Sequence, residues 1–120
     1  MGNAIWLLSE DREEDDWDHS LILVNEKLLD KLADELNVKR LSDVYDHSIL
    51  AEEYGGEVKP NFIIAEELEN VLDLMIRAIR DGSASKLNED NEIIEELEDC
   101  LKKVSSAKSK GLKVRLAIVP

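Results

Sequence analysis

Two short apolar segments near the ends of the sequence limit its fold more than any other feature. Residues 4–8 form a continuous apolar run, and residues 112–119 alternate between aliphatic and other side chains. Both patterns are typical of β-strands. Because each segment is too short to be stable alone, we expect the two strands to pair with each other. In the second strand, Lys113 and Arg115 occupy the alternate positions, so we expect both to face solvent.

Between these strands, three segments carry the apolar spacing of amphipathic helices. One covers residues 26–36, a second covers 65–80, and a third, capped by Asp90 or Asn91, runs to about Ala107. Residues 21–24 are four consecutive aliphatics and predict an extended or strand-like segment, and residues 52–60, with Gly55-Gly56 and Pro60, predict a loop. The pattern predicts an α+β fold. We expect one domain over residues 1–120, with a small antiparallel sheet that includes both terminal strands, packed against three or four helices.

The charge of the chain is strongly negative and unevenly distributed. Its net charge is −13, from 28 acidic and 15 basic side chains, yet residues 102–120 contain six lysines and arginines and no acid. Most of the surface would therefore repel a phosphate backbone, which argues against a nucleic-acid partner. Either a basic protein partner or simple solubility accounts for the charge.

The cysteine and hydropathy patterns bear on the compartment. Cys100 is the only cysteine, so no disulfide can form within the chain, and its place in an apolar helix stripe predicts a packed, unreactive thiol. No apolar run is long enough to span a membrane, and residues 4–8 are too short for a signal peptide. We therefore expect a cytoplasmic protein without a membrane partner, either a monomer or a weak homodimer formed through sheet edges.

Residues 9–18 form the most acidic part of the chain. Asp11, Glu13 and Asp15 alternate as in a calcium-binding EF-hand loop, but positions 6 and 12 of such a loop would hold Asp16 and Ile22 instead of Gly and Glu. The block is therefore either a solvated loop or a binding surface for a basic partner. The residues that would form this surface are Glu10, Asp11, Glu13, Glu14, Asp15 and Asp16.

Both histidines of the chain occur in the same short phrase. Residues 17–22 read Trp-Asp-His-Ser-Leu-Ile, and residues 45–50 read Tyr-Asp-His-Ser-Ile-Leu. In one hypothesis, Asp18, His19, Asp46 and His47 converge on a metal ion, or His19 acts with Asp18 and Ser20 in hydrolysis. In the other, each phrase is a turn in which Asp and Ser bond nearby backbone N–H groups. The sequences around the two copies do not match further, so they do not indicate an internal duplication.

Signatures of known catalytic sites are absent from the sequence. It has no phosphate-binding glycine-rich loop, no Cys-x-x-Cys and no His-Glu-x-x-His, and no Gly-x-Ser-x-Gly elbow. The two phrases also lack the close histidine spacing that presets a metal site. We therefore expect no cofactor and no dedicated metal site, and favour a protein that is not an enzyme.

Several short patterns of the chain occur together in a group of small bacterial proteins. They include residues 2–7 (Gly-Asn-Ala-Ile-Trp-Leu), the first Asp-His-Ser, residues 41–46 (Leu-Ser-Asp-Val-Tyr-Asp) and the segment 112–120. In these features the chain resembles that group, which has no assigned activity. The resemblance implies a bacterial, cytosolic, stand-alone domain.

Two classes of function follow from these observations. The first is a non-catalytic acidic module that binds a basic partner protein, as an inhibitor or immunity protein does. The second is a metal-dependent or hydrolytic enzyme that uses the pairs Asp18-His19 and Asp46-His47. The second class requires the two histidines to lie close together, whereas the first does not.

Overall fold

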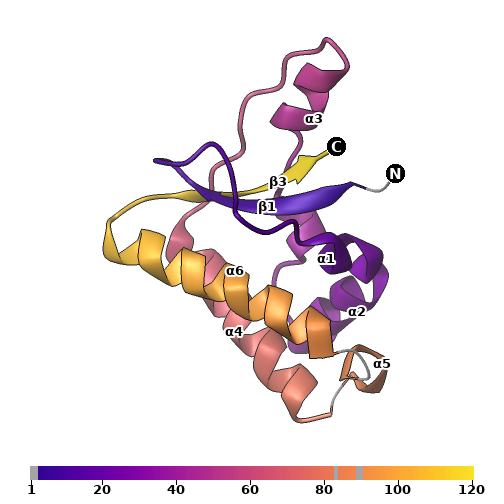
Figure 1. Cartoon of the computed structure of the whole chain (residues 1–120). Helices are drawn as coiled ribbons and strands as arrows, with labels where there is room; N and C mark the ends of the chain where they lie inside the picture. Colours follow the sequence, from indigo (N-terminus) through magenta and orange to yellow (C-terminus); the bar gives the residue numbers. More distant parts are fainter. Residues whose placement is uncertain (1–2, 83, 89–90) are drawn as a thin grey trace.

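The predicted pairing of the terminal strands is confirmed. The computed structural model describes residues 3–82, 84–88 and 91–120 (Figure 1). Strand β1 (Ala4–Ser9) pairs antiparallel with β3 (Val114–Val119), so that Ala4 lies opposite Val119 and Leu7 lies opposite Leu116. The fold is α+β, as expected, with helices packed on a small sheet.

A third strand makes the sheet mixed instead of purely antiparallel. Strand β2 (Tyr45–Asp46) has two residues and pairs parallel with β3, which places β3 at the centre of the order β1-β3-β2. A 3₁₀ turn, η1 (Leu41–Val44), leads into it. A strand of two residues carries no periodicity, so the sequence could not predict this pairing.

The three long helices form where their apolar stripes predict them. They are α2 (Glu26–Leu36), α4 (Ala65–Arg80) and α6 (Asn91–Ser109), and the short α5 (Ser85–Asn88) lies between the last two. Their inward faces and the inner face of the sheet bury one continuous aliphatic core. Asn37 ends α2 in the left-handed conformation with φ 56°, which asparagine tolerates better than most residues. Asp90, one of the two expected caps of α6, lies outside the described residues.

Two short helices replace segments that were predicted as non-helical. Residues 21–24, expected to be extended, belong to α1 (Ser20–Val24), and the predicted loop 52–60 begins inside α3 (Ser48–Glu53). Four consecutive aliphatic residues fit a strand or a buried helix equally well. In the structure Ile22 is completely buried, Leu21 and Leu23 are half-buried and Val24 is exposed, so the run turns one side of a short helix toward the core.

Different elements pack on the two faces of the sheet. Figure 1 shows α4 and α6 below the sheet and α3, with the loop that follows it, above. Because α3 and this loop cover the upper face, Arg115 does not face open solvent as expected: its side chain is only 11% exposed. None of the helices in the described ranges is both long and apolar enough to cross a membrane.

Candidate functional site

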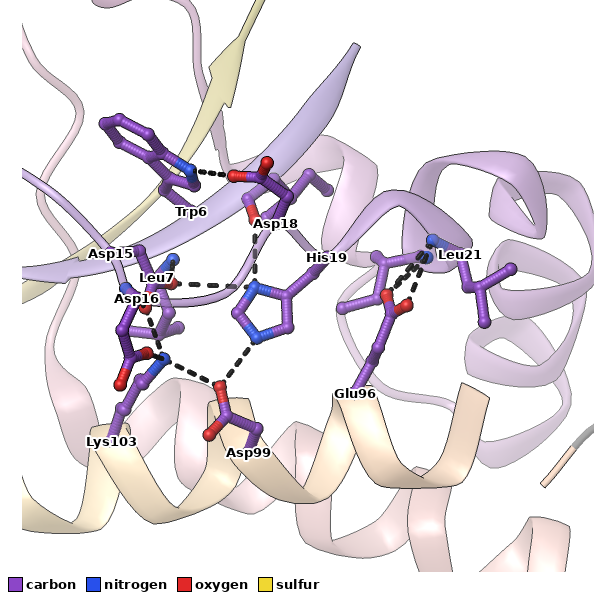
Figure 2. Close-up of polar contacts among 12 residues, drawn as sticks. Trp6, Leu7, Asp15, Asp16, Asp18, His19, Leu21, Glu96, Asp99 and Lys103 are labelled. Atoms are coloured by element: carbon purple, nitrogen blue, oxygen red, sulfur yellow. Dashed lines mark hydrogen bonds and ion pairs between the residues drawn. The ribbon is translucent and has the colours of Figure 1, made fainter. Parts of the chain in front are cut away.

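The side chain of His19 is completely buried between β1 and α6. Its Nδ1 lies 2.9 Å from the carbonyl oxygen of Ile5, and its Nε2 lies 2.7 Å from a carboxylate oxygen of Asp99 on α6. Figure 2 shows the ring directed at α6, with a contact at each nitrogen. The main-chain N–H of His19 also donates to Ile5, over 3.0 Å. The residue therefore fastens the start of α1 to both β1 and α6.

Both nitrogens of the His19 ring face acceptors of the protein itself. A carbonyl oxygen and a carboxylate can only accept hydrogen bonds, and a second carboxylate, that of Asp15, lies 3.5 Å from Nδ1. Because both nitrogens are buried and occupied by groups of the protein, this arrangement holds structure and is poorly suited to general acid–base catalysis on another molecule.

Beside His19, the ammonium of Lys103 lies among three carboxylates. It contacts Asp15, lies 2.6 Å from Asp16 and 2.7 Å from Asp99 (Figure 2). Burial opposes the charge on Lys103, but the hydrogen bonds to these three carboxylates outweigh it and raise the pKa of the amine. The bond to Lys103 is also the main reason that the pKa of Asp16 falls to about 2.

Asp15 connects this cluster to the sheet. Its side chain is fully buried, and one carboxylate oxygen accepts the main-chain N–H of Leu7 over 2.8 Å. The loop between β1 and α1 is thus fixed at Asp15 by both a strand and a helix. Asp15 anchors the acidic loop and does not present its carboxylate to solvent.

The start of α1 is capped from a distant part of the chain. Glu96 of α6 is buried, and its carboxylate accepts the main-chain N–H groups of Leu21 at 3.0 Å and Ile22 at 3.3 Å. These N–H groups belong to the first turn of α1 and have no hydrogen-bond acceptor within the helix. Burial is the main effect on Glu96 and raises the pKa of its carboxyl, although the two bonds favour the ionised form.

The second Asp-His-Ser phrase surrounds an ion pair on the upper side of the sheet. Asp46 is fully buried and accepts bonds from the Ser48 hydroxyl at 2.8 Å and from Nη1 of Arg115 at 3.0 Å. It also accepts the main-chain N–H groups of Ser48 and Asn61. His47 is exposed, and its side chain has no hydrogen bond or ion pair among the described residues. The phrase forms a turn in which the Asp46 carboxylate accepts the main-chain N–H at the start of α3.

The two phrases therefore do not build one shared site. His19 meets Asp99 and Asp15, Asp18 accepts the indole N–H of Trp6 at 2.6 Å, and Ser20 is exposed. Within the described ranges, one group of acidic or histidine side chains is close enough to share a metal ion, namely Asp15, Asp16 and Asp99. The ammonium of Lys103 contacts all three of these carboxylates.

The remaining candidates for partner binding lie on the surface of the acidic loop. Glu10 accepts the main-chain N–H of Lys113 at 2.6 Å, and Asp11 bonds Ser9, which lowers the pKa of Asp11. Glu13 and Glu14 are exposed and make no hydrogen bond or ion pair within the described part of the chain. They line an open hollow of about 420 Å³ on the upper side of the sheet.

Apart from Glu13 and Glu14, the residues that line this hollow were not predicted from the sequence. Trp6 of β1 and Glu52 of α3 are among them. Only the fold brings them together, because they belong to elements far apart in the chain. Cys100, by contrast, is buried as expected, and burial raises the pKa of its thiol.

Comparisons with known proteins found no match: no family model, no curated protein and no solved structure matches the chain.

Proposed function

We propose that the protein is a non-catalytic module that binds a basic partner protein through the surface of its acidic loop. The observation that carries this proposal is the way the loop is held. Its base is fixed by Asp15 and Lys103, while Glu13 and Glu14 remain exposed without a hydrogen bond or ion pair to any residue that the structure describes. A rigid loop loses little conformational entropy when it binds, so its carboxylates are preorganised for a cationic surface.

The chemistry of the buried cluster agrees with a structural role. His19 has an acceptor on each nitrogen and no exposed surface, so a substrate could not reach it without opening the fold. Of the other groups that the sequence offered for catalysis, Asp18 bonds Trp6 and Asp46 pairs with Arg115. Ser20 and His47 are exposed, and their side chains make no hydrogen bond or ion pair among the described residues. This leaves the exposed carboxylates as the groups available to another molecule.

The test is to capture partners with the tagged protein from the cells that express it, and then to rebuild the complex from purified components. We expect a basic protein in a stoichiometric complex whose dissociation constant rises steeply with salt. The doubly neutralised variant Glu13→Gln/Glu14→Gln should bind at least tenfold more weakly. A matched variant, Glu66→Gln/Glu95→Gln, removes the same charge from exposed positions on α4 and α6 and should bind normally.

Two results would contradict the proposal. One is the absence of any stoichiometric basic partner. The other is an equal loss of affinity in both variants, which would mean that only the total charge matters.

A further inference from the structure

Strand β1 is one edge of the sheet, and the acidic loop lies along the outer side of this edge. In an antiparallel pair, alternate residues bond the neighbouring strand, and those between them direct their main-chain groups away from it. Ile5 and Leu7 are residues of the second kind. The carbonyl oxygen of Ile5 accepts the main-chain N–H of His19 at 3.0 Å, and the N–H of Leu7 donates to the carboxylate of Asp15 at 2.8 Å. The loop thus occupies the hydrogen-bonding positions that a further strand would use.

The residues of β1 provide no protection of their own against pairing with another chain. The strand reads Ala-Ile-Trp-Leu-Leu-Ser, without a charged side chain or a proline, and it pairs with β3 in regular register. Charges, proline and bulges are the usual means by which edge strands avoid further pairing, and short uncharged apolar segments are prone to it. The opposite edge of the sheet is β2, which has only two residues. The acidic loop therefore covers the longer of the two edges.

One face of α6 holds the loop in this position. Glu96, Asp99 and Lys103 are spaced three and four residues apart, so their side chains project from the same face of the helix. Figure 2 shows what each of them bonds: Glu96 the start of α1, Asp99 the ring of His19, and Lys103 the carboxylate of Asp15. Asp15 is the link between the helix and the sheet, because its two oxygens bond Lys103 and β1, respectively. The attachment of the loop to the edge of β1 therefore depends on this buried carboxylate.

We propose that the acidic loop acts as a strap that keeps the protein monomeric by covering the edge of β1. When the loop detaches, Ile5, Leu7 and Ser9 direct free main-chain groups outward along an uncharged strand. The occupant that this edge fits is a second copy of the chain, because two identical strands pair antiparallel about a twofold axis and each satisfies the other. Leu7 then lies opposite Leu7 of the second copy, and Ile5 lies opposite its Ser9.

The geometry of the sheet limits this association to a dimer. Pairing through β1 joins the two three-stranded sheets into one and leaves the short β2 at each outer edge. An isologous contact uses the same surface on both copies, so no β1 edge remains for a third copy. The inference is independent of the proposed function, because it concerns the buried side of the loop at Asp15 and His19, whereas the proposed partner meets the exposed Glu13 and Glu14.

The test removes the link between the loop and the strand in the full chain. By light scattering, we expect the parent to have the mass of one chain and Asp15→Ala to have twice that mass at the same protein concentration. Asp16→Ala is the matched control: Asp16 also contacts Lys103, but none of its bonds reaches β1. This variant should remain monomeric.

Circular dichroism verifies that each variant is folded. Should Asp15→Ala fail to fold, Asp15→Asn takes its place, since it keeps the size of the side chain but loses the charge that attracts Lys103. The same doubling of mass is then expected at about tenfold higher protein concentration.

A second substitution and hydrogen exchange locate the contact. Ser9→Pro removes the outward N–H of Ser9, and proline is tolerated at such a position of an edge strand. Asp15→Ala/Ser9→Pro should therefore return to the mass of one chain. In the Asp15→Ala dimer the second copy bonds the Leu7 amide, so this amide should exchange at least tenfold more slowly than in the monomeric double variant.

Each contrary result rejects a stated part of the proposal. A dimeric parent, a folded variant at Asp15 that stays monomeric, or equal association of Asp16→Ala would overturn the strap. Association that Ser9→Pro leaves intact, or that continues to larger aggregates, would overturn pairing through β1. None of these results bears on the capture of a basic partner by Glu13 and Glu14, which is measured separately.

Discussion

The two Asp-His-Ser phrases contain the same three residues, but the histidine is buried in one and the aspartate is buried in the other. In residues 17–22, His19 is buried and Asp18 lies at the surface, whereas in residues 45–50 Asp46 is buried and His47 is exposed. Each precedes a short helix, α1 or α3. The first helix is capped by Glu96 from another part of the chain, while the second is capped by its own Asp46. The same three residues can thus form a local turn or make contacts between elements that are distant in the sequence, depending on what packs against them.

The strongest contrast should come from the aspartates. Asp46→Ala leaves the nearly buried Arg115 without its counter-ion and removes the cap of α3. We expect a loss of about 3–5 kcal/mol in the free energy of unfolding, typical of breaking a buried ion pair. Asp18→Ala removes one bond to Trp6 at the surface and should cost far less. Urea denaturation of both variants measures the difference, and equal losses would refute the assignment.

For the histidines, the order should reverse. His19→Ala removes a buried ring and one of the hydrogen-bond partners of both Ile5 and Asp99, so we expect a loss of roughly 2–4 kcal/mol. His47→Ala alters an exposed side chain that has no hydrogen bond or ion pair among the described residues, and it should change stability by less than about 0.5 kcal/mol. Thermal unfolding of the pair is the measurement. A large effect at His47 would show that the second phrase has a role the fold does not reveal.

The serines should show a smaller version of the same contrast. The Ser48 hydroxyl bonds Asp46 and accepts a bond from Arg115 at 3.1 Å, so Ser48→Ala should cost about 1–2 kcal/mol. Ser20 is exposed and its hydroxyl has no bond among the described residues, so Ser20→Ala should be close to neutral. Both variants can be compared by urea denaturation under one set of conditions. Similar costs for the two would remove the distinction between local and distant capping.

The smallest expected effect concerns pH at the cap of α1. Burial raises the pKa of Glu96 in the folded protein, so the folded state holds its proton at a pH where the unfolded chain has released it. This group therefore makes the protein less stable as the pH rises from the ordinary carboxyl range, about 4.3, through the raised value. Glu96→Gln keeps an oxygen to accept from Leu21 and should remove this slope.

The exposed neighbour Glu95 provides the control for this measurement, because Glu95→Gln changes the same charge on the same helix without affecting the cap. The free energy of unfolding of both variants and the parent, measured across the acid range, gives the slopes. An unchanged slope in Glu96→Gln would mean that Glu96 is not the group that titrates.

Local patterns predicted the main elements of this fold because those elements carry their own signal. The helices α2, α4 and α6 have stripes that repeat for several turns, and residues 112–116, which lead into and begin β3, alternate between aliphatic and basic side chains. The α1 segment was predicted wrongly because its cap, Glu96, lies 75 positions away from Leu21 and leaves no local trace. The same limit applies to Arg115. The alternating pattern places it on the face of the sheet that was expected to be open to solvent, but α3 covers that face.

Prediction of the site followed the same division. The acidic loop was visible as a run of charge, so Glu13 and Glu14 could be named as candidates. The burial of Asp15 could not be foreseen, since it depends on Lys103 of α6 and the N–H of Leu7. Trp6 and Glu52 joined the hollow only through strand pairing and the position of α3.

The central position of β3 also has a consequence for how the chain reaches its native state. Both β1 and β2 pair with β3 in the sheet, and β3 follows all the described helices in the sequence. The antiparallel pair α4 and α6 can associate earlier, since it requires closure of a much shorter loop. The sheet must therefore be the last layer to assemble, and its dependence on distant contacts predicts slow folding for a chain of this size. Until that step, the apolar edge of β1 is available to other chains, so refolding yield should fall as protein concentration rises.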